Sequence, residues 1–239
     1  MKWLLTASAA LYLFGSFRRP LFQAGLVGEL IYLGTRGFEL GRLPLIGPHD
    51  TLVFFSTSIA LMGLPFVNSR VVKHDAIFSW GVGAIAAFFG LSALAFRASS
   101  MPLPPILNTI WFECHVALAF FAYALFAIGA FLGGIYLARR DRTLLDLQYK
   151  AVLVGFSFFS GSMVSGGIWG YYAWGTYWLW TAKEFWTSIL WLFYSLYLHL
   201  RLKGPNADTI VAWAGIAGLG ITLFTYLGVS ILLKSSHSF

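Results

Sequence analysis

The sequence WGYYAWGTYWLWTAKEFWTSILWLFYSLYLH, from Trp169 to His199, decides how the rest of the chain is interpreted. It holds six of the chain's ten tryptophans. Each indole needs a large matched space and a partner for its N–H, so a soluble core rarely holds so many in so short a segment. At a membrane interface, one edge of each ring stays in water. The run therefore predicts an aromatic shelf (residues 169–180) at a membrane surface, whose flat faces can also stack on a planar ligand.

Composition places the chain among integral membrane proteins. Hydrophobic residues make up 59% of its 239 residues and charged residues 10%, whereas soluble domains carry about 25% charged residues. The net charge of +7 comes from Lys and Arg in short loops, where they determine topology rather than bind nucleic acid. Cys114 is the single cysteine, which excludes an internal disulfide, and the lack of a Cys-x-x-Cys-His motif means that the chain does not attach its own c-type haem.

Eight apolar segments predict an all-α, polytopic membrane protein of about eight transmembrane helices, organised as a single domain over residues 1–239. The first two segments are short for the roughly 20 residues that cross a bilayer; the first is interpreted as a short span rather than a signal peptide. Polar or basic segments separate the spans, including a predicted loop over residues 138–150. The expected spans are residues 3–17, 21–33, 51–67, 77–96, 110–137, 151–171, 186–200 and 210–233.

The distribution of Lys and Arg predicts the orientation. One side of the eight-span arrangement holds ten of these residues and the other holds six, which together make the 16 in the chain. The side with ten is expected to be cytoplasmic. This places the aromatic shelf and both termini outside.

Two kinds of polar residue lie in or beside the predicted spans. Glu29 lies inside the second span, where a carboxylate costs several kcal/mol unless it is neutral or paired; we expect a neutral group hydrogen-bonded to a neighbouring helix, with a proton or ligand role as the alternative.

The five histidines divide into an external set and a set at the cytoplasmic edge. Two histidines on facing helices suit the axial positions of haem iron, while the external side lacks the Cys or carboxylate cluster of a zinc site. The external set is His49, His115 and His237, and the cytoplasmic set is His74 and His199.

The segment WGTYWLWTAKEFW, followed by LYLHLR, resembles the tryptophan-rich "WWD" signature of the CcsA/ResC family of cytochrome c biogenesis, a signature that also occurs in related form in CcmC and CcmF proteins. RGFELGRLPL resembles an early loop of that family. WFECHVALAFFAYALF resembles its helix bearing the first external histidine, and FTYLGVSILLKSSHSF resembles its C-terminal segment bearing the second. The resemblance covers the chain from about residue 34 to the end.

The resemblance implies that the protein handles non-covalent, b-type haem at the outer face of a bacterial inner membrane or an equivalent energy-transducing membrane. His115 and His237 would be the axial ligands, with the propionates near Lys183 or Lys234. His199 would meet haem arriving from the cytoplasmic side, with a counterpart in a CcsB/ResB-like partner. The macrocycle would be held by Trp174, Trp178 and Trp180.

The chain departs from the signature at one position, since Thr181 follows Trp180 where the family has Asp. His49, in a second departing segment, is expected to be a surface residue rather than a third external ligand. The leading hypothesis is haem handling for a c-type cytochrome as one subunit of a membrane complex. One alternative is a cytochrome subunit of a quinone-linked electron-transfer complex, favoured by the missing acid, in which His74 and His199 hold a second haem. Another is a haem-free structural or regulatory anchor. No self-contained enzyme is proposed.

Overall fold

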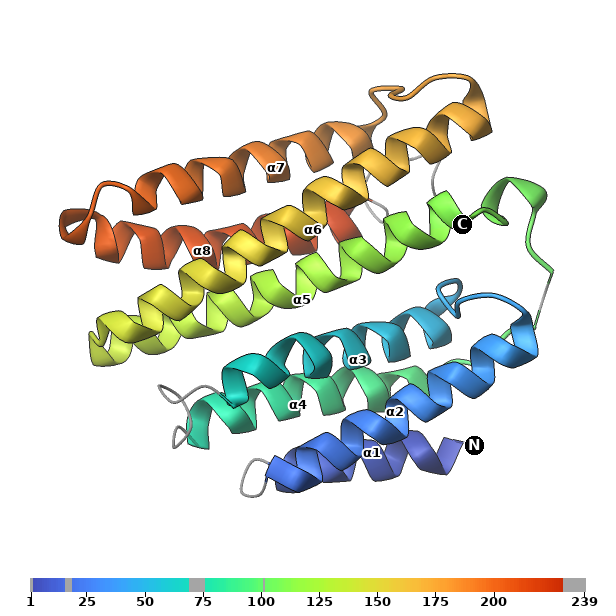
Figure 1. Ribbon diagram of the computed structural model, residues 1–239, viewed down its shortest axis with the longest axis horizontal. Helices are drawn as coiled ribbons and strands as arrows, with labels where there is room; N and C mark the ends of the chain where they lie inside the picture. Colours follow the sequence, from blue (N-terminus) through green and yellow to red (C-terminus); the bar gives the residue numbers. More distant parts are fainter. Residues whose placement is uncertain (1, 16–18, 69–75, 101, 230–239) are drawn as a thin grey trace. The chain divides into compact units, whose positions relative to one another are not determined.

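The computed structural model describes residues 2–15, 19–68, 76–100 and 102–229. The described residues form helices joined by short turns and contain no strand (Figure 1), which confirms the predicted all-α class. The chain divides into two compact units, residues 1–104 and 105–239. The expectation that residues 1–239 act as a single membrane domain stays a prediction.

The first unit consists of four helices. α1 (Lys2–Gly15) packs against α2 (Arg19–Leu40) and α4 (Ala76–Ser92), while α3 (Pro48–Val67) packs against α4 and α2. A 3₁₀ turn over Ala93–Ala95 extends α4. The second helix is longer than the predicted span over residues 21–33, because it continues to Leu40, into the polar segment that follows that span. A buried cluster of apolar side chains joins the helices; it consists of Leu5, Tyr32, Val53 and Ala93.

His49, near the start of α3, is buried in the first unit. Its side chain is only 1% exposed, and its Nδ1 donates to the carbonyl of Ala93 at 2.8 Å. Its Nε2 accepts from the hydroxyl of Tyr32 on α2 at 2.7 Å. The expectation that His49 is a surface residue was therefore wrong, and both ring nitrogens are engaged in packing rather than ligation. A buried ion pair between Arg36 and Asp50, at 3.3 Å, joins the same two helices.

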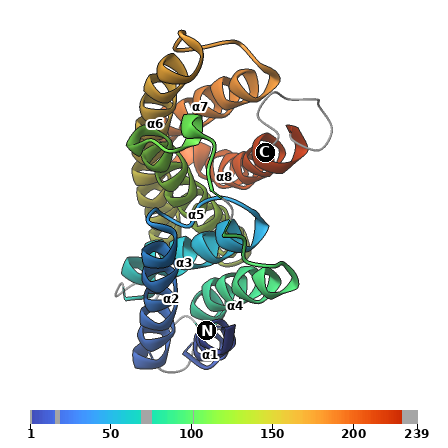
Figure 2. The ribbon, with the colours of Figure 1, turned by 90° about the vertical axis from the view of Figure 1, so that its right-hand side faces the viewer.

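The second unit contains four helices that run along one another (Figures 1 and 2). α5 (Ile110–Arg139) packs chiefly against α6 (Arg142–Trp174) and α8 (Asp208–Leu223), and α7 (Ala182–Arg201) packs against α8 and α6. A π-helical turn over Phe224–Gly228 continues α8.

The predicted loop over residues 138–150 is wrong, because α6 begins at Arg142. Only two residues separate α5 from α6: Arg140 takes a left-handed conformation with φ 59°, and Asp141 caps the new helix by accepting from the Thr143 amide. Ion pairs also tie this end of the unit together, from Arg142 and Arg201 to Asp208. Charges that suggested a solvated loop are therefore the polar ends of packed helices.

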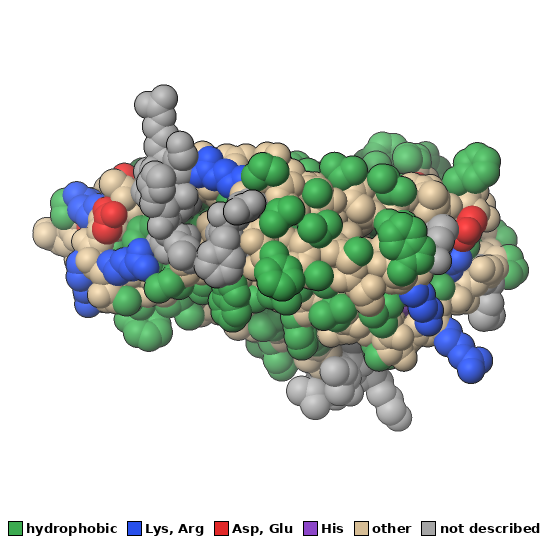
Figure 3. Space-filling view, turned by 90° about the horizontal axis from the view of Figure 1, so that it is seen from below, with side chains coloured by type: hydrophobic (Ala, Val, Ile, Leu, Met, Phe, Trp, Pro, Cys, Tyr) green, Lys and Arg blue, Asp and Glu red, His purple; other side chains and the backbone are tan. Residues whose placement is uncertain are grey.

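Five helices in the described part of the chain are long and apolar enough to cross a membrane. Many hydrophobic side chains lie on the outer surface of the helices (Figure 3). α1, α2 and α7 do not reach the same length and apolarity, so the remaining three of the eight predicted spans stay predictions. The five helical segments are Pro48–Val67, Ile77–Ala95, Ile110–Arg139, Arg142–Trp174 and Pro205–Gly228.

Candidate functional site

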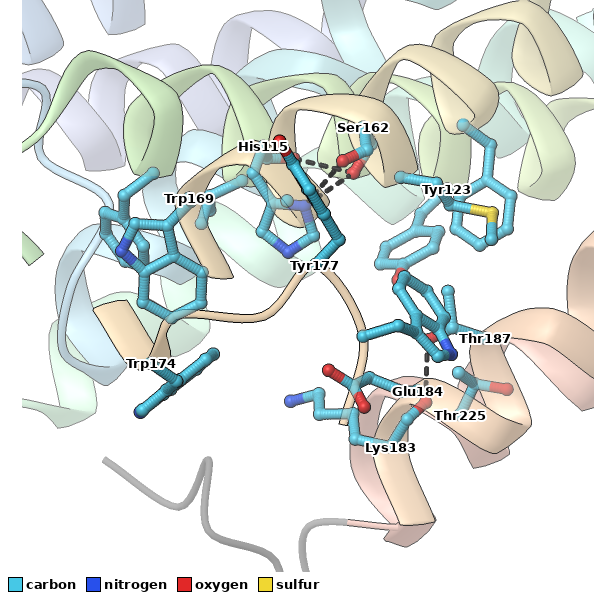
Figure 4. Close-up of a pocket in the computed structure, with 16 residues that line it drawn as sticks. His115, Tyr123, Ser162, Trp169, Trp174, Tyr177, Lys183, Glu184, Thr187 and Thr225 are labelled. Carbon is cyan, nitrogen blue, oxygen red and sulfur yellow. Dashed lines mark hydrogen bonds between the residues drawn. The ribbon is translucent and has the colours of Figure 1, made fainter. Parts of the chain in front are cut away.

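A cavity of about 190 Å³ opens within the second unit, between α5, α6, the start of α7 and the loop that joins α6 to α7. Its walls are rich in aromatic side chains, and the polar groups that reach it include an imidazole, an ammonium and a carboxylate (Figure 4). The aromatic lining residues are Phe112, Tyr123, Phe159, Trp169, Trp174, Tyr177 and Trp178. The imidazole, the ammonium and the carboxylate belong to His115, Lys183 and Glu184.

His115 lies in the second turn of α5, and its imidazole lines the cavity. Nδ1 contacts the backbone carbonyl of Ser162 at 2.8 Å, and because a carbonyl only accepts, Nδ1 carries the proton. In the neutral ring the lone pair is then on Nε2. The hydroxyl of Ser162 donates to the carbonyl of His115 at 2.8 Å, which ties α6 to α5 at this point. A histidine whose Nδ1–H is held by a backbone carbonyl is the usual arrangement of an Nε2 metal ligand.

Two residues on α6 set the plane of this imidazole. Gly166 lies behind the ring, where a Cβ would be 2.5 Å from the His115 Nδ1, so any side chain there would displace the ring. Trp169 stacks beside it, with ring centroids 6.4 Å apart and planes 16° apart. The Trp169 indole is held in turn by donation from Nε1 to the carbonyl of Ile106 at 2.7 Å. The ring orientation is therefore determined by close packing. In the sequence, the small residues of the run GSMVSGGIWG (residues 161–170) indicate such packing.

The loop after α6 turns the aromatic shelf over the cavity. Gly175 ends α6 in a left-handed conformation with φ 74°, which a residue without Cβ adopts without strain. Trp174 meets Trp169 edge to face, with centroids 4.9 Å apart. Trp178 lies further along the loop, where the chain returns, and it also lines the cavity. Gly175 thus allows the chain to fold back on itself after α6.

Thr181 and Glu184 hold the end of this loop through a capping box. The Thr181 hydroxyl accepts from the Glu184 amide at 3.3 Å, and the Glu184 carboxylate accepts from the amides of Leu179 and Thr181, both at 2.9 Å. These two amides flank Trp180, whose φ of 56° lies in the left-handed region. Amides on either side of such a residue converge on one anion. Glu184 therefore stabilises the strained conformation of Trp180.

The capping box shows what Thr181 contributes at this position. Thr and Asp are both good N-cap residues, since each offers a side-chain oxygen to the first-turn amides. Thr181 retains that contact without the charge of Asp, while Glu184 supplies the negative charge at the start of α7. The helix start and the loop geometry therefore persist without the acid.

Lys183 brings a positive charge to the cavity. Figure 4 shows its side chain and that of Glu184 on the side opposite the His115 imidazole. Lys183 lies before the predicted span over residues 186–200. Burial lowers the pKa of its ammonium group. An anionic group of a ligand would offset that desolvation cost, because an opposite charge favours the protonated ammonium. The cavity is therefore suited to a flat apolar ligand with an electrophilic metal and an anionic edge.

The structure brings together four of the residues that the sequence singled out: His115, Trp174, Trp178 and Lys183. Trp180 does not line the cavity; its side chain is 69% exposed and meets Trp178 edge to face. His199 is exposed near the far end of α7, where its Nδ1 donates to the carbonyl of Ser195 at 2.8 Å. It lies 17 residues beyond Ala182, which at the helical rise is roughly 25 Å from the loop. His74, His237 and Lys234 lie outside the described residues.

Sequence reasoning missed several cavity residues. Tyr123, Ser162 and Gly166 come from the middle of two apolar helices, where their residue types are common. The small residues of α6 do not by themselves identify the imidazole as the group that approaches them. No group of three or more His, Cys, Asp or Glu side chains forms a metal site in the described segments.

Comparison with known proteins adds independent information. The chain is 28% identical to "Cytochrome c biogenesis protein CcsA" of Guillardia theta, over 87% of this chain and 80% of that protein. It is 28% identical to the CcsA protein of Chlamydomonas reinhardtii, over 99% of this chain and 72% of that protein. "Protein NrfI" of Wolinella succinogenes is 30% identical over 92% of this chain, which corresponds to 25% of that longer protein.

These relatives support a role in the maturation of c-type cytochromes, and with the candidate spans they support a multi-pass membrane protein. Residues 47–237 match the model of a protein family described as "Cytochrome C assembly protein". These residues include the cavity and the aromatic shelf. The resemblance drawn from the sequence is therefore confirmed. Because the family model matches well over half of the chain, the chain belongs to the cytochrome c assembly protein family.

Proposed function

We propose that this protein binds haem as cargo in the cavity of the second unit, at the outer face of the membrane, and passes it on for cytochrome c maturation. The observation that carries the proposal is the arrangement of His115, whose Nδ1–H is held by Ser162 while its ring lines an aromatic cavity. This leaves Nε2 as the nitrogen with the lone pair for iron. A b-type haem, held without covalent bonds, fits a chain with a single cysteine.

The donor set of the cavity fits the chemical parts of haem. An imidazole nitrogen suits the iron, the indoles of Trp174 and Trp178 offer apolar faces to the macrocycle, and the Lys183 ammonium suits a propionate. At about 190 Å³, the cavity is smaller than the roughly 300–1,000 Å³ of sites that enclose small molecules. A bound macrocycle would stay partly uncovered, which suits cargo that must leave.

The second axial ligand is proposed from the family resemblance, as His237. A CcsB/ResB-like membrane subunit and an apocytochrome are the proposed partners, since the relatives act in cytochrome c biogenesis. In this arrangement His115 binds iron, Ser162 and Gly166 orient the imidazole, and Glu184 fixes the loop that carries Trp178. Haem supplies the iron and the vinyl groups; the protein's residues bind and orient it.

The test is haem loading and release with the complete protein in membranes. The protein is loaded with haem, its optical and paramagnetic-resonance spectra are recorded, and an apocytochrome is then added. We expect a six-coordinate low-spin haem that leaves for the apocytochrome. His115→Ala should give a five-coordinate or partly high-spin species that external imidazole restores, because one axial position opens.

His199→Ala is the matched control, because this histidine lies at the other end of α7 and should leave the spectrum unchanged. A haem that is reduced and reoxidised but never released would instead support the electron-transfer alternative. A protein that takes up no haem would support the anchor alternative. A wild-type six-coordinate signal in His115→Ala would refute the assignment of the ligand.

A further inference from the structure

We propose that Glu29 is a reversible proton-binding site inside the first unit, protonated at rest and able to ionise through rotation of hydroxyl groups alone. This carboxyl on α2 is 0% exposed and lies in a separate compact unit from the haem cavity. Its contacts in the described structure are hydroxyl groups from two neighbouring helices. Tyr12 comes from α1, and Ser56 and Thr57 come from α3.

The surroundings of the carboxyl disfavour a permanent negative charge. A buried carboxylate costs several kcal/mol unless a cation pairs with it. Arg36, seven residues further along α2, is already paired with Asp50. Among the described side chains of the four helices, Tyr12 is the titratable group that contacts Glu29. The remaining charged or histidine side chains lie towards helix ends: Lys2, Arg19, Arg36, Glu39, His49 and Asp50.

The position of Ser56 identifies which oxygen carries the proton. Its Oγ lies 2.7 Å from Glu29 Oε1 and also 2.7 Å from the backbone carbonyl of Ala86 on α4. A hydroxyl has one hydrogen, so it cannot donate to both oxygens. If Oε1 carries a proton, it donates to Ser56 and Ser56 donates to Ala86, and both short contacts are hydrogen bonds. With an ionised Glu29, one of them would be an unbridged contact between two acceptors. The geometry therefore favours a neutral carboxyl at rest.

The other carboxyl oxygen completes the neutral form. Oε2 is then the carbonyl oxygen of the acid, and it accepts from the Tyr12 hydroxyl at 2.9 Å. Thr57 lies 3.0 Å from Oε2 and 3.0 Å from the carbonyl of Val53, so its hydrogen has two alternative acceptors. In the neutral form every polar atom of the carboxyl is hydrogen-bonded.

The same heavy atoms also accommodate the ionised form. When the Oε1–H bond breaks, the proton goes to solvent water and its electron pair stays on the carboxylate. Ser56 can then turn its hydrogen from Ala86 to Oε1, and Thr57 can direct its hydrogen to Oε2 beside that of Tyr12. Three donors to a carboxylate stabilise its charged form. The backbone carbonyls that lose a hydroxyl belong to helices, whose N–H groups continue to bond them.

α4 adds a space that a proton site of this kind needs. Gly90 faces the carboxyl, and a Cβ there would be 2.8 Å from Glu29 Oε1 and 3.1 Å from Ser56 Oγ. The absence of a side chain lets the carboxyl contact Ser56 on one side and the α4 backbone on the other. The network therefore depends on three helices in addition to α2, and it is not a local property of one turn.

Infrared spectroscopy of the complete protein in membranes tests the proposal. A protonated carboxyl gives a C=O stretching band separate from the amide bands, and this band shifts in heavy water. We expect a band at neutral pH that is missing in Glu29→Gln and that declines reversibly as the pH is raised while the helices remain folded. Glu39→Gln is the matched control, because that side chain is 55% exposed and its removal should leave the band unchanged.

Ser56→Ala is a second variant that does not remove the carboxyl. It takes away the acceptor of the Oε1 proton, so the Glu29 band should move to higher frequency and become easier to distinguish. If no protonated band is assigned to Glu29 at neutral pH in either background, the neutral resting state is refuted. A band that stays constant up to the pH at which the helices unfold would refute reversible binding.

Discussion

Gly166→Ala tests the haem cavity by moving the proposed ligand without removing it. An ideal Cβ at Gly166 would be 2.5 Å from Nδ1 and 2.8 Å from Cε1 of His115. Atoms in ordinary contact lie about 3.5 Å apart, so the imidazole would have to retreat by roughly 1 Å. The hydrogen bond from Nδ1 to the Ser162 carbonyl, now 2.8 Å, would then be lost.

The expected effect on haem binding is larger than the effect on the fold. Loss of the hydrogen bond that orients a metal-ligating histidine costs about 10–100-fold in affinity, equivalent to about 1.4–2.7 kcal/mol. Overpacking costs about 1–3 kcal/mol of stability, but alanine in place of a helical glycine restores about 0.5–1 kcal/mol. The free energy of unfolding should therefore fall by about 1–2 kcal/mol.

Haem titration followed by absorbance, together with thermal unfolding, measures both quantities. Gly161→Ala is the matched control on the same helix, because a Cβ there would meet its nearest neighbour, Leu118 Cδ1, at an ordinary 3.4 Å. It should bind haem as the parent does and unfold at a slightly higher temperature. If Gly166→Ala also keeps the parent affinity and spectrum, the imidazole of His115 is not the ligand that the cavity presents.

The remaining predictions concern the loop and its orientation. Thr181→Asp should be tolerated and Thr181→Ala should cost about 1 kcal/mol of stability, because only alanine removes the N-cap; a failure of the aspartate variant to fold would contradict this. Trp178→Ala should weaken haem retention by about 1 kcal/mol, since it removes a cavity wall, while Trp180→Ala should have a smaller effect; equal losses would place both rings on the ligand. In a Cys114→Ser background, the cysteine of Asp141→Cys should not react with an impermeant thiol reagent added outside. Labelling at this position would reverse the predicted orientation.

The helical membrane class and the family could be predicted from the sequence because both depend on local patterns. Apolar runs of sufficient length predict helices that cross a bilayer, and five of them reappear in the described structure. Polarity alone misplaced two boundaries. The segments after Leu33 and Leu137 were expected to be loops, but Arg36 and Arg142 pair with carboxylates on neighbouring helices and remain helical.

The candidate site could be predicted only in part. His115, Trp174 and Trp178 were identified from residue type and resemblance, and the structure brings them to one cavity. The same reasoning also included Trp180, because alternating tryptophans in a loop look equivalent in sequence. Its exposure follows from the left-handed conformation that Glu184 stabilises through two amides.

The sequence by itself determined that this chain is a helical membrane protein of the cytochrome c assembly family, since hydrophobicity, indole content and motif spacing are properties of short segments. Only the tertiary structure decided which nitrogen of His115 carries the proton, that His49 is buried, and that the Glu29 carboxyl is hydrogen-bonded to hydroxyls from two other helices. Each of these depends on contacts between residues far apart in the chain. Such contacts form when helices pack, and their partners leave no mark on the local sequence pattern.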